Sequence, residues 1–221
     1  MITMEAISSQ LLPPFIIFKG ICGAVLMKQW QSYEDATVVF TKNHWMNKDM
    51  NILYLKFLKR YLPEKRIGLL YDSAPSHISK DVKNWIDTEN KTKPDNERLI
   101  VELIDPCLTS VYQPPDVAMI KDFKLKVRIL YQNYINKLSK TSLKPGDKVA
   151  LSRETLVEMI VKAIDEINLI NKKTRRIAQA FRQCGVDPWV DNQDDFMKHL
   201  ESLNQNSVYK SLTDAQEALN L

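Results

Sequence analysis

The sequence predicts an α/β domain in which a mixed sheet is flanked by helices and followed by a helical carboxyl-terminal part. Three observations carry this prediction. The chain opens with two apolar segments joined by a short turn, it then alternates helical patterns with short buried strands, and it ends in long amphipathic helices. A hairpin supplies antiparallel strands and a strand–helix–strand crossover supplies parallel ones, so we expect both kinds of pairing.

The first elements are a hairpin and a helix. The segments ITMEAIS and PPFIIFKG predict two strands joined by a turn around Ser8–Gln10. Residues 49–62 place apolar side chains at helical spacing, and Pro63 follows the end of this helix.

Two buried strands come next, with a helix between them. RIGLLYD is a short apolar run that closes on Asp72, which is typical of a buried strand. A short helix over residues 78–88, capped by Ser79 or Ser76, separates it from RLIVELID. Because Pro106 follows RLIVELID, this second buried strand is expected to stop there.

The remaining elements are helices that carry many basic side chains. A long helix over roughly residues 117–139 shows an apolar stripe at helical spacing. Another helix opens at Ser152, and a last helical segment covers about residues 172–184.

Length and composition suit one domain with an appendage. The chain has 221 residues, of which 44% are hydrophobic and 26% are charged, so it can bury a substantial core. No run of about 18 apolar residues occurs, so no membrane span is expected. We assign a core to residues 1–140, a helical extension of it to 141–190, and an acidic, partly ordered tail to 191–221.

Several kinds of site are excluded by residue usage. Cys22, Cys107 and Cys184 are widely spaced and odd in number, which favours reduced, buried thiols of an intracellular protein over a disulfide frame or a zinc site. None of the five glycines forms a nucleotide-binding loop. The four tryptophans are expected to be core or rim aromatics and not base-stacking platforms. They are Trp30, Trp45, Trp85 and Trp189.

Charge is distributed unevenly along the chain, whose net charge is +4. Residues 118–182 hold 15 Lys and Arg against six Asp and Glu, whereas residues 183–221 hold two against seven. A positive band of this kind suits contact with a phosphate backbone, and the acidic tail that follows would shield the band. The alternative is that the basic residues simply form a solvated helix face, and the charge distribution taken by itself favours this alternative.

Two aspartates stand out by their positions. Asp72 ends a buried strand, where open α/β sheets place their ligands, and Asp116 follows two prolines before a long helix. Two carboxylates at one sheet edge repel each other unless a divalent cation lies between them, so this pair fits magnesium or manganese. Taken singly, each has a favoured structural alternative: Asp72 as the cap of the Ser73–Pro75 turn, and Asp116 as a helix N-cap.

Several separated blocks carry a resemblance to a known family. LLYDSAPSH ends a strand on an aspartate and has a histidine five residues later, and TSVYQPPD leads into a basic helix. LLPPFIIFKG, FTKNHWMNKDM and IAQAFRQCGV stand at the start, before the first helix and near the end. In this order the blocks resemble the DDE superfamily endonuclease domain of pogo/Tigger/jerky-type transposases and their domesticated relatives, over roughly residues 11–188.

The resemblance implies an RNase H-like fold and a three-aspartate site that uses Mg²⁺ or Mn²⁺ to cleave and join DNA strands. Asp72 matches the second catalytic, metal-binding aspartate and Asp116 the third. His77 matches the family histidine, and we expect it to shape the turn through a hydrogen bond. Ser73 stands where the family usually has asparagine.

The family's first aspartate lies on a strand upstream of the hairpin, and this chain has no aspartate before Asp35. Glu5, an earlier acid, lies in the middle of a predicted strand. We therefore expect an amino-terminally truncated core that lacks the first strand and the helix-turn-helix region of such transposases. Two carboxylates hold a metal weakly, so we predict that this chain alone does not cut DNA.

Two further function classes stay open beside the nuclease. The first is a DNA-binding remnant, and the second is a helical protein-interaction module without a nucleic-acid role. DNA binding without sequence preference is assigned to eight basic residues. They are Lys121, Lys124, Lys126, Arg128, Lys172, Lys173, Arg175 and Arg176. The resemblance also implies DNA as the partner and the nucleus as the location, and it leaves a homodimer open.

Overall fold

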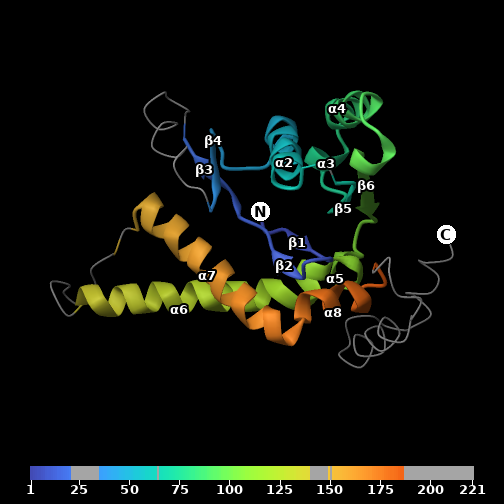
Figure 1. Cartoon of the computed structure of the whole chain (residues 1–221). Coiled ribbons are helices and arrows are strands. Elements are labelled where there is room, and N and C mark those ends of the chain that lie inside the picture. Colours follow the sequence, from blue (N-terminus) through green and yellow to red (C-terminus); the bar gives the residue numbers. More distant parts are fainter. Residues whose placement is uncertain (21–34, 64, 140–148, 150, 187–221) are drawn as a thin grey trace.

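The structure of the chain is a computed structural model, shown in Figure 1. It describes residues 1–20, 35–63, 65–139, 149 and 151–186. The tail predicted over residues 191–221 lies outside this part of the chain, as do Cys22, Trp30 and Trp189. The predicted domain boundaries therefore stay predictions.

The strands of the described residues form three two-stranded sheets. The pairs are β1 (Met4–Glu5) with β2 (Gln10–Leu11), β3 (Phe15–Lys19) with β4 (Thr37–Thr41), and β5 (Ile67–Asp72) with β6 (Leu99–Ile104). The first pair is antiparallel and the other two are parallel, so both predicted kinds of pairing are present. The sequence prediction missed β4, although its residues TVVFT are the β-branched and aromatic types that favour strands.

The helices follow the predicted order. They are α2 (Lys48–Tyr61), α3 (Pro75–Ile78), α4 (Lys80–Lys91), the 3₁₀ turn η1 (Asp95–Glu97), α5 (Thr109–Tyr112), the π-helical turn η2 (Pro115–Met119), α6 (Ile120–Ser139), α7 (Arg153–Thr174) and α8 (Arg176–Gln183). The side chains of Ser79 and Ser152 cap α4 and α7 by accepting hydrogen bonds from backbone N–H groups, which confirms both predicted caps.

The helix predicted over residues 172–184 is divided at Arg175. This residue has a left-handed backbone with φ of 55°, so α7 ends before it and α8 begins after it. The buried Asn171 supports the break, because its carbonyl oxygen Oδ1 accepts a hydrogen bond from the N–H of Ile177 at 2.9 Å. Helical periodicity continues through this region, so the sequence pattern did not show the break.

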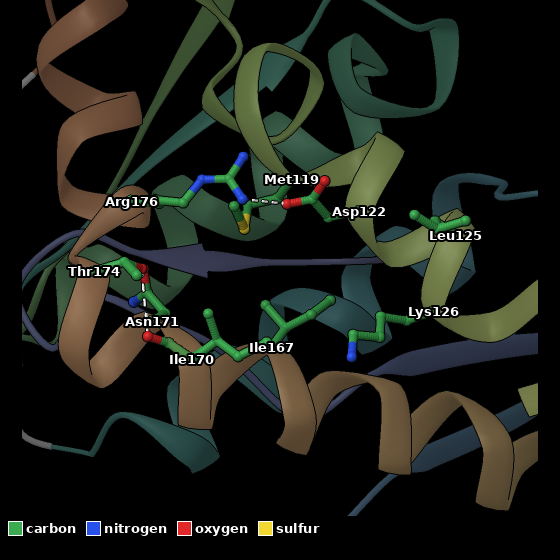
Figure 2. Close-up of a pocket in the computed structure, with 9 residues that line it drawn as sticks. All are labelled: Met119, Asp122, Leu125, Lys126, Ile167, Ile170, Asn171, Thr174 and Arg176. Carbon is green, nitrogen blue, oxygen red and sulfur yellow. Dashed lines mark hydrogen bonds and ion pairs between the residues drawn. The ribbon is translucent and has the colours of Figure 1, made fainter. Parts of the chain in front are cut away.

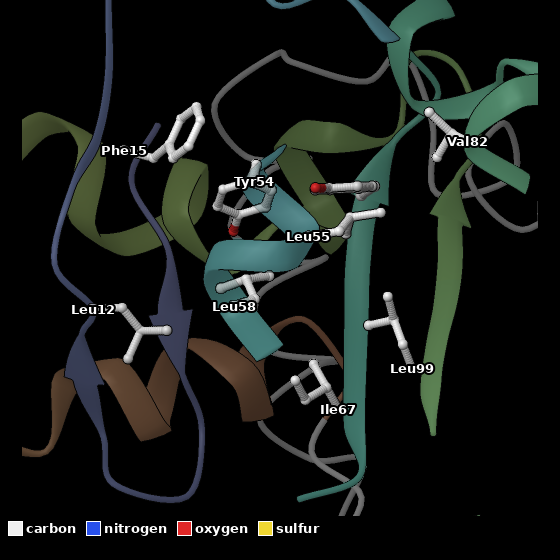
Figure 3. Packing of buried hydrophobic residues seen from close by; sticks show 9 residues of the cluster. Leu12, Phe15, Tyr54, Leu55, Leu58, Ile67, Val82 and Leu99 are labelled. Carbon is white, nitrogen blue, oxygen red and sulfur yellow. The ribbon is translucent and has the colours of Figure 1, made fainter. Parts of the chain in front are cut away.

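The strand segment over residues 11–16 lies between α2 and α7. Leu12 and Phe15 pack against Tyr54 and its neighbours on α2, and the rings of Phe15 and Tyr54 meet edge to face with centroids 5.5 Å apart (Figure 3). Leu11 and Ile16 instead belong to two clusters that include buried residues of α7. The long α7 is therefore a covering layer of the core.

An amide side chain fastens α7 to the hairpin. The Nδ2 of Asn168 donates to the carbonyl of Leu11 at 3.0 Å, and its Oδ1 accepts from the N–H of Leu11 at 2.8 Å. These two bonds satisfy backbone groups on β2 that a further strand would otherwise take.

Two remaining predictions concern thiols and membranes. Cys184 is buried as expected, whereas Cys107 is exposed, so the prediction of a buried thiol is wrong for Cys107. None of the helices among the described residues has the length and apolar character needed to cross a membrane.

Candidate functional site

The topology brings the two predicted aspartates to one edge of the β5–β6 pair. In the parallel register Asp72 is opposite Ile104, so both strands end at the same edge. Asp72 is the last residue of β5, and the chain that leaves β6 passes through α5 into η2, which contains Asp116. Asp116 lies inside η2 and the N-cap is Pro114, so the alternative of Asp116 as an N-cap is wrong.

The charge of Asp72 acts on the carboxyl group of Asp116. Partial burial of its carboxyl group raises the pKa of Asp116, although the residue as a whole is exposed, and the charge of Asp72 raises this pKa further. Lys124 of α6 acts in the opposite direction and lowers it. Both aspartates and the first turns of α6 therefore belong to one neighbourhood.

The carboxylate of Asp72 is held by groups from the following turn. Its Oδ1 lies 2.6 Å from Nδ1 of His77 and accepts a hydrogen bond from the N–H of Ala74 at 3.3 Å. His77 is almost fully buried and stacks on Tyr71, with ring centroids 4.1 Å apart and planes 14° apart. Nδ1 of His77 also makes a hydrogen bond with the backbone carbonyl of Asp72 at 3.1 Å, which is the kind of turn-shaping bond that we predicted, and Asp72 also caps its own turn.

The sequence analysis missed a residue that supports this turn. Asn51 of α2 is fully buried, its Oδ1 accepts from the hydroxyl of Tyr71 at 2.9 Å, and its Nδ2 donates to the carbonyl of Ser76 at 3.0 Å. A buried polar group of this kind needs such partners. The available signal was an asparagine on the same helical face as Leu55 and Leu58.

The oxygen ligands at this site are of the type that divalent cations prefer, but only two carboxylates supply them. Carboxylate oxygens are the ligands that Mg²⁺ and Mn²⁺ prefer, and Asp72 and Asp116 are the residues that would hold such an ion. In the described part of the chain, no group of three His, Cys, Asp or Glu residues could bind a metal. Glu5 accepts a hydrogen bond from Ser8 on the hairpin turn.

The eight predicted basic residues divide into two groups. Lys126 pairs with Glu166 at 3.0 Å, and Arg176 pairs with Asp122, so these two cations tie α6 to α7 and α8. The other six side chains belong to exposed residues on α6, on α7 and at the junction of α7 with α8. They are Lys121, Lys124, Arg128, Lys172, Lys173 and Arg175.

A small pocket of about 100 Å³ lies between α6 and α7 (Figure 2). Its lining is mostly apolar, and the ion pair of Asp122 with Arg176 joins its two sides. Leu125 and Ile170 line it and are themselves about half exposed. Neither Asp72 nor Asp116 lines this pocket, so it is separate from the pair of carboxylates.

Comparison with known families gives one match. The family described as DDE superfamily endonuclease matches residues 1–181, a range that includes both aspartates and all eight basic residues. No curated protein and no solved structure matches the chain. The α/β architecture with a helical carboxyl-terminal part agrees with the predicted RNase H-like fold.

Proposed function

Because the chain belongs to the DDE superfamily endonucleases, we propose that it binds the phosphate backbone of DNA through the basic surface of α6, α7 and α8. The observation that carries this proposal is the order of the elements, because the exposed cations Lys121, Lys124 and Arg128 lie on α6, which directly follows the turn η2 that contains Asp116. The sequence blocks around Asp72 and Asp116 support an origin from a pogo/Tigger-type transposase, and the protein acts in the nucleus.

The residues around Asp72 would prepare it to hold a cation. His77 and the N–H of Ala74 fix one oxygen of its carboxylate, while Asn51 holds the turn that carries His77. A bound Mg²⁺ or Mn²⁺ would supply Lewis-acid activation of a phosphoryl group or of water.

We propose that this chain does not catalyse the cleavage of DNA strands. Cleavage with two metal ions needs ligands on both sides of the reacting phosphate. The described residues bring together two carboxylates, and two carboxylates hold at most one ion weakly. We therefore assign DNA binding to the chain without strand cleavage.

A second candidate function is a helical protein-interaction module. The observation that favours it is the apolar pocket between α6 and α7, which Leu125 and Ile170 leave partly open to solvent. This function predicts that reversing the charge of the basic residues leaves every interaction of the chain unchanged.

DNA binding is tested by titrating a labelled duplex with the protein at increasing salt concentrations. The logarithm of the affinity should fall linearly with the logarithm of the salt concentration. The variant K121E/K124E/R128E should bind more weakly and should reduce this slope by about three, because each lysine or arginine contributes about one.

The matched control is K56E/R60E/K65E, which changes the net charge equally at exposed positions of α2 and the segment after it. It should leave most of the affinity and the slope in place. Equal losses in both variants would mean that net charge alone attracts DNA. Absence of binding by the unaltered chain would refute the proposed function.

A further inference from the structure

An exposed pair of aromatic rings lies in the connection between β4 and α2. Trp45 is 67% exposed, and its ring stacks on that of His44 with centroids 5.6 Å apart and planes 25° apart. The expectation that the tryptophans are core or rim aromatics is therefore wrong for Trp45. A large aromatic side chain that contacts water over most of its surface has no role in the core.

The local backbone holds these rings at the surface. His44 has a φ of 57°, a left-handed conformation that residues other than glycine seldom adopt. The side chain of Asn43 accepts a hydrogen bond from the N–H of Trp45 at 3.3 Å, and Asn47 caps the helix that follows. Unusual backbone conformations of this kind concentrate at functional sites.

The ring pair precedes α2, and the first turn of this helix contacts the turn that follows Asp72. In the first turn of this helix, Asn51 binds the carbonyl of Ser76 and the hydroxyl of Tyr71, which directly precedes Asp72. Lys48, at the start of α2, pairs with Asp81 in the first turn of α4. The connection that carries the rings is thus anchored to the turn after Asp72.

We propose that His44 and Trp45 form a stacking platform for an unpaired nucleobase of a DNA strand bound along the Asp72–Asp116 site. This inference rests on the proposed DNA binding. Every base has a flat π-face, so an exposed indole binds unpaired bases without sequence preference, whereas the bases of an intact duplex are already stacked. Lys42, exposed three residues before Trp45, would lie near the phosphates of the same strand.

The test titrates a single-stranded oligonucleotide and a blunt duplex with the unaltered chain and with Trp45→Ala. Each titration is done at low and at high salt. We expect the affinity of the variant for the single strand to fall roughly fivefold or more. The fold-change should be the same at both salt concentrations, because stacking releases no counterions. Affinity for the blunt duplex should stay unchanged, and Trp45→Tyr should recover most of the affinity for the single strand.

Ile7→Ala is the control, because Ile7 is a comparably exposed apolar residue on the turn between β1 and β2. It should bind both oligonucleotides as the unaltered chain does. If Trp45→Ala binds the single strand normally, or weakens both oligonucleotides equally, the platform is refuted while DNA binding stands. If the unaltered chain binds neither oligonucleotide, the proposed function fails and the platform fails with it.

Discussion

At the scale of single residues, Asp116 is held in conditions that disfavour its charge. Partial burial and the neighbouring charge of Asp72 both raise its pKa in the folded protein. A carboxyl group with a raised pKa in the folded state destabilises the fold where it is ionised. This cost is absent below the ordinary pKa of aspartate, develops as the pH rises from that pKa to the folded-state pKa, and is complete above the folded-state pKa.

We therefore expect Asp116→Asn to raise the melting temperature at pH 7. The gain should disappear as the pH is lowered below the ordinary pKa of aspartate, because the native carboxyl is then neutral as well. Thermal unfolding followed by circular dichroism between pH 3 and 8 measures both effects. The control is Asp87→Asn on the exposed face of α4, which removes one negative charge and should give no such gain. A lower melting temperature of Asp116→Asn at pH 7 would contradict the repulsion between the two carboxylates.

The residues of the site differ in how well the sequence predicts them, because some depend on local signals and others on long-range contacts. Asp72 and Asp116 were predictable, because a strand end and a pair of prolines are local signals. Asn51 was not, because its role depends on contacts with Tyr71 and Ser76, 20 and 25 residues away. The exposure of Trp45 was not predictable either, since it follows from the backbone conformation of His44.

At the scale of elements, the junction between α7 and α8 combines stability with the proposed DNA contact. Arg175 carries a positive charge at the surface and also adopts the left-handed conformation that glycine tolerates best. The N–H of Arg175 donates to the carbonyl of Asn171 at 2.8 Å, which closes the end of α7.

Arg175→Gly should separate these two roles. We expect the variant to gain up to about 1 kcal/mol of unfolding free energy, because glycine relieves the left-handed strain. Its affinity for DNA should fall at the same time, because one basic side chain is lost. Arg175→Ala is the matched control, since it removes the same charge but keeps the strain. Urea denaturation and duplex titration of both variants give the measurements, and a destabilised Arg175→Gly would contradict the role of the backbone conformation.

Helices and strands were predicted well where a local sequence pattern determines them. The helix α2 and the strands β5 and β6 agree with the sequence prediction because their apolar periodicity and flanking prolines are local. The predicted pairing of the hairpin is wrong, because β1 pairs with the two-residue β2, whereas the segment PPFIIFKG forms β3 and pairs in parallel with β4. The strand β2 makes hydrogen bonds with the amide of Asn168, 157 residues further along the chain. No local pattern carries that information.

At the scale of the whole molecule, the basic helices belong to the fold that carries the aspartates. Buried residues of α7 pack with Leu11 and with the β3–β4 pair, so the surface of α7 is fixed relative to the strands. The ion pairs of Lys126 and Arg176 then tie α6 to α7 and to α8. The exposed cations and the carboxylate pair therefore belong to one packed arrangement of helices and strands.

We propose that this arrangement binds DNA but does not cut it. The most direct test of this proposal is the incubation of supercoiled plasmid with the chain in Mn²⁺ or Mg²⁺, under salt conditions in which binding has been measured, with Asp72→Ala in parallel. Nicking that also occurs with Asp72→Ala is attributed to a contaminating nuclease and is subtracted. We predict bound plasmid that stays supercoiled with either protein. Metal-dependent nicking by the unaltered chain that is absent with Asp72→Ala would contradict the claim.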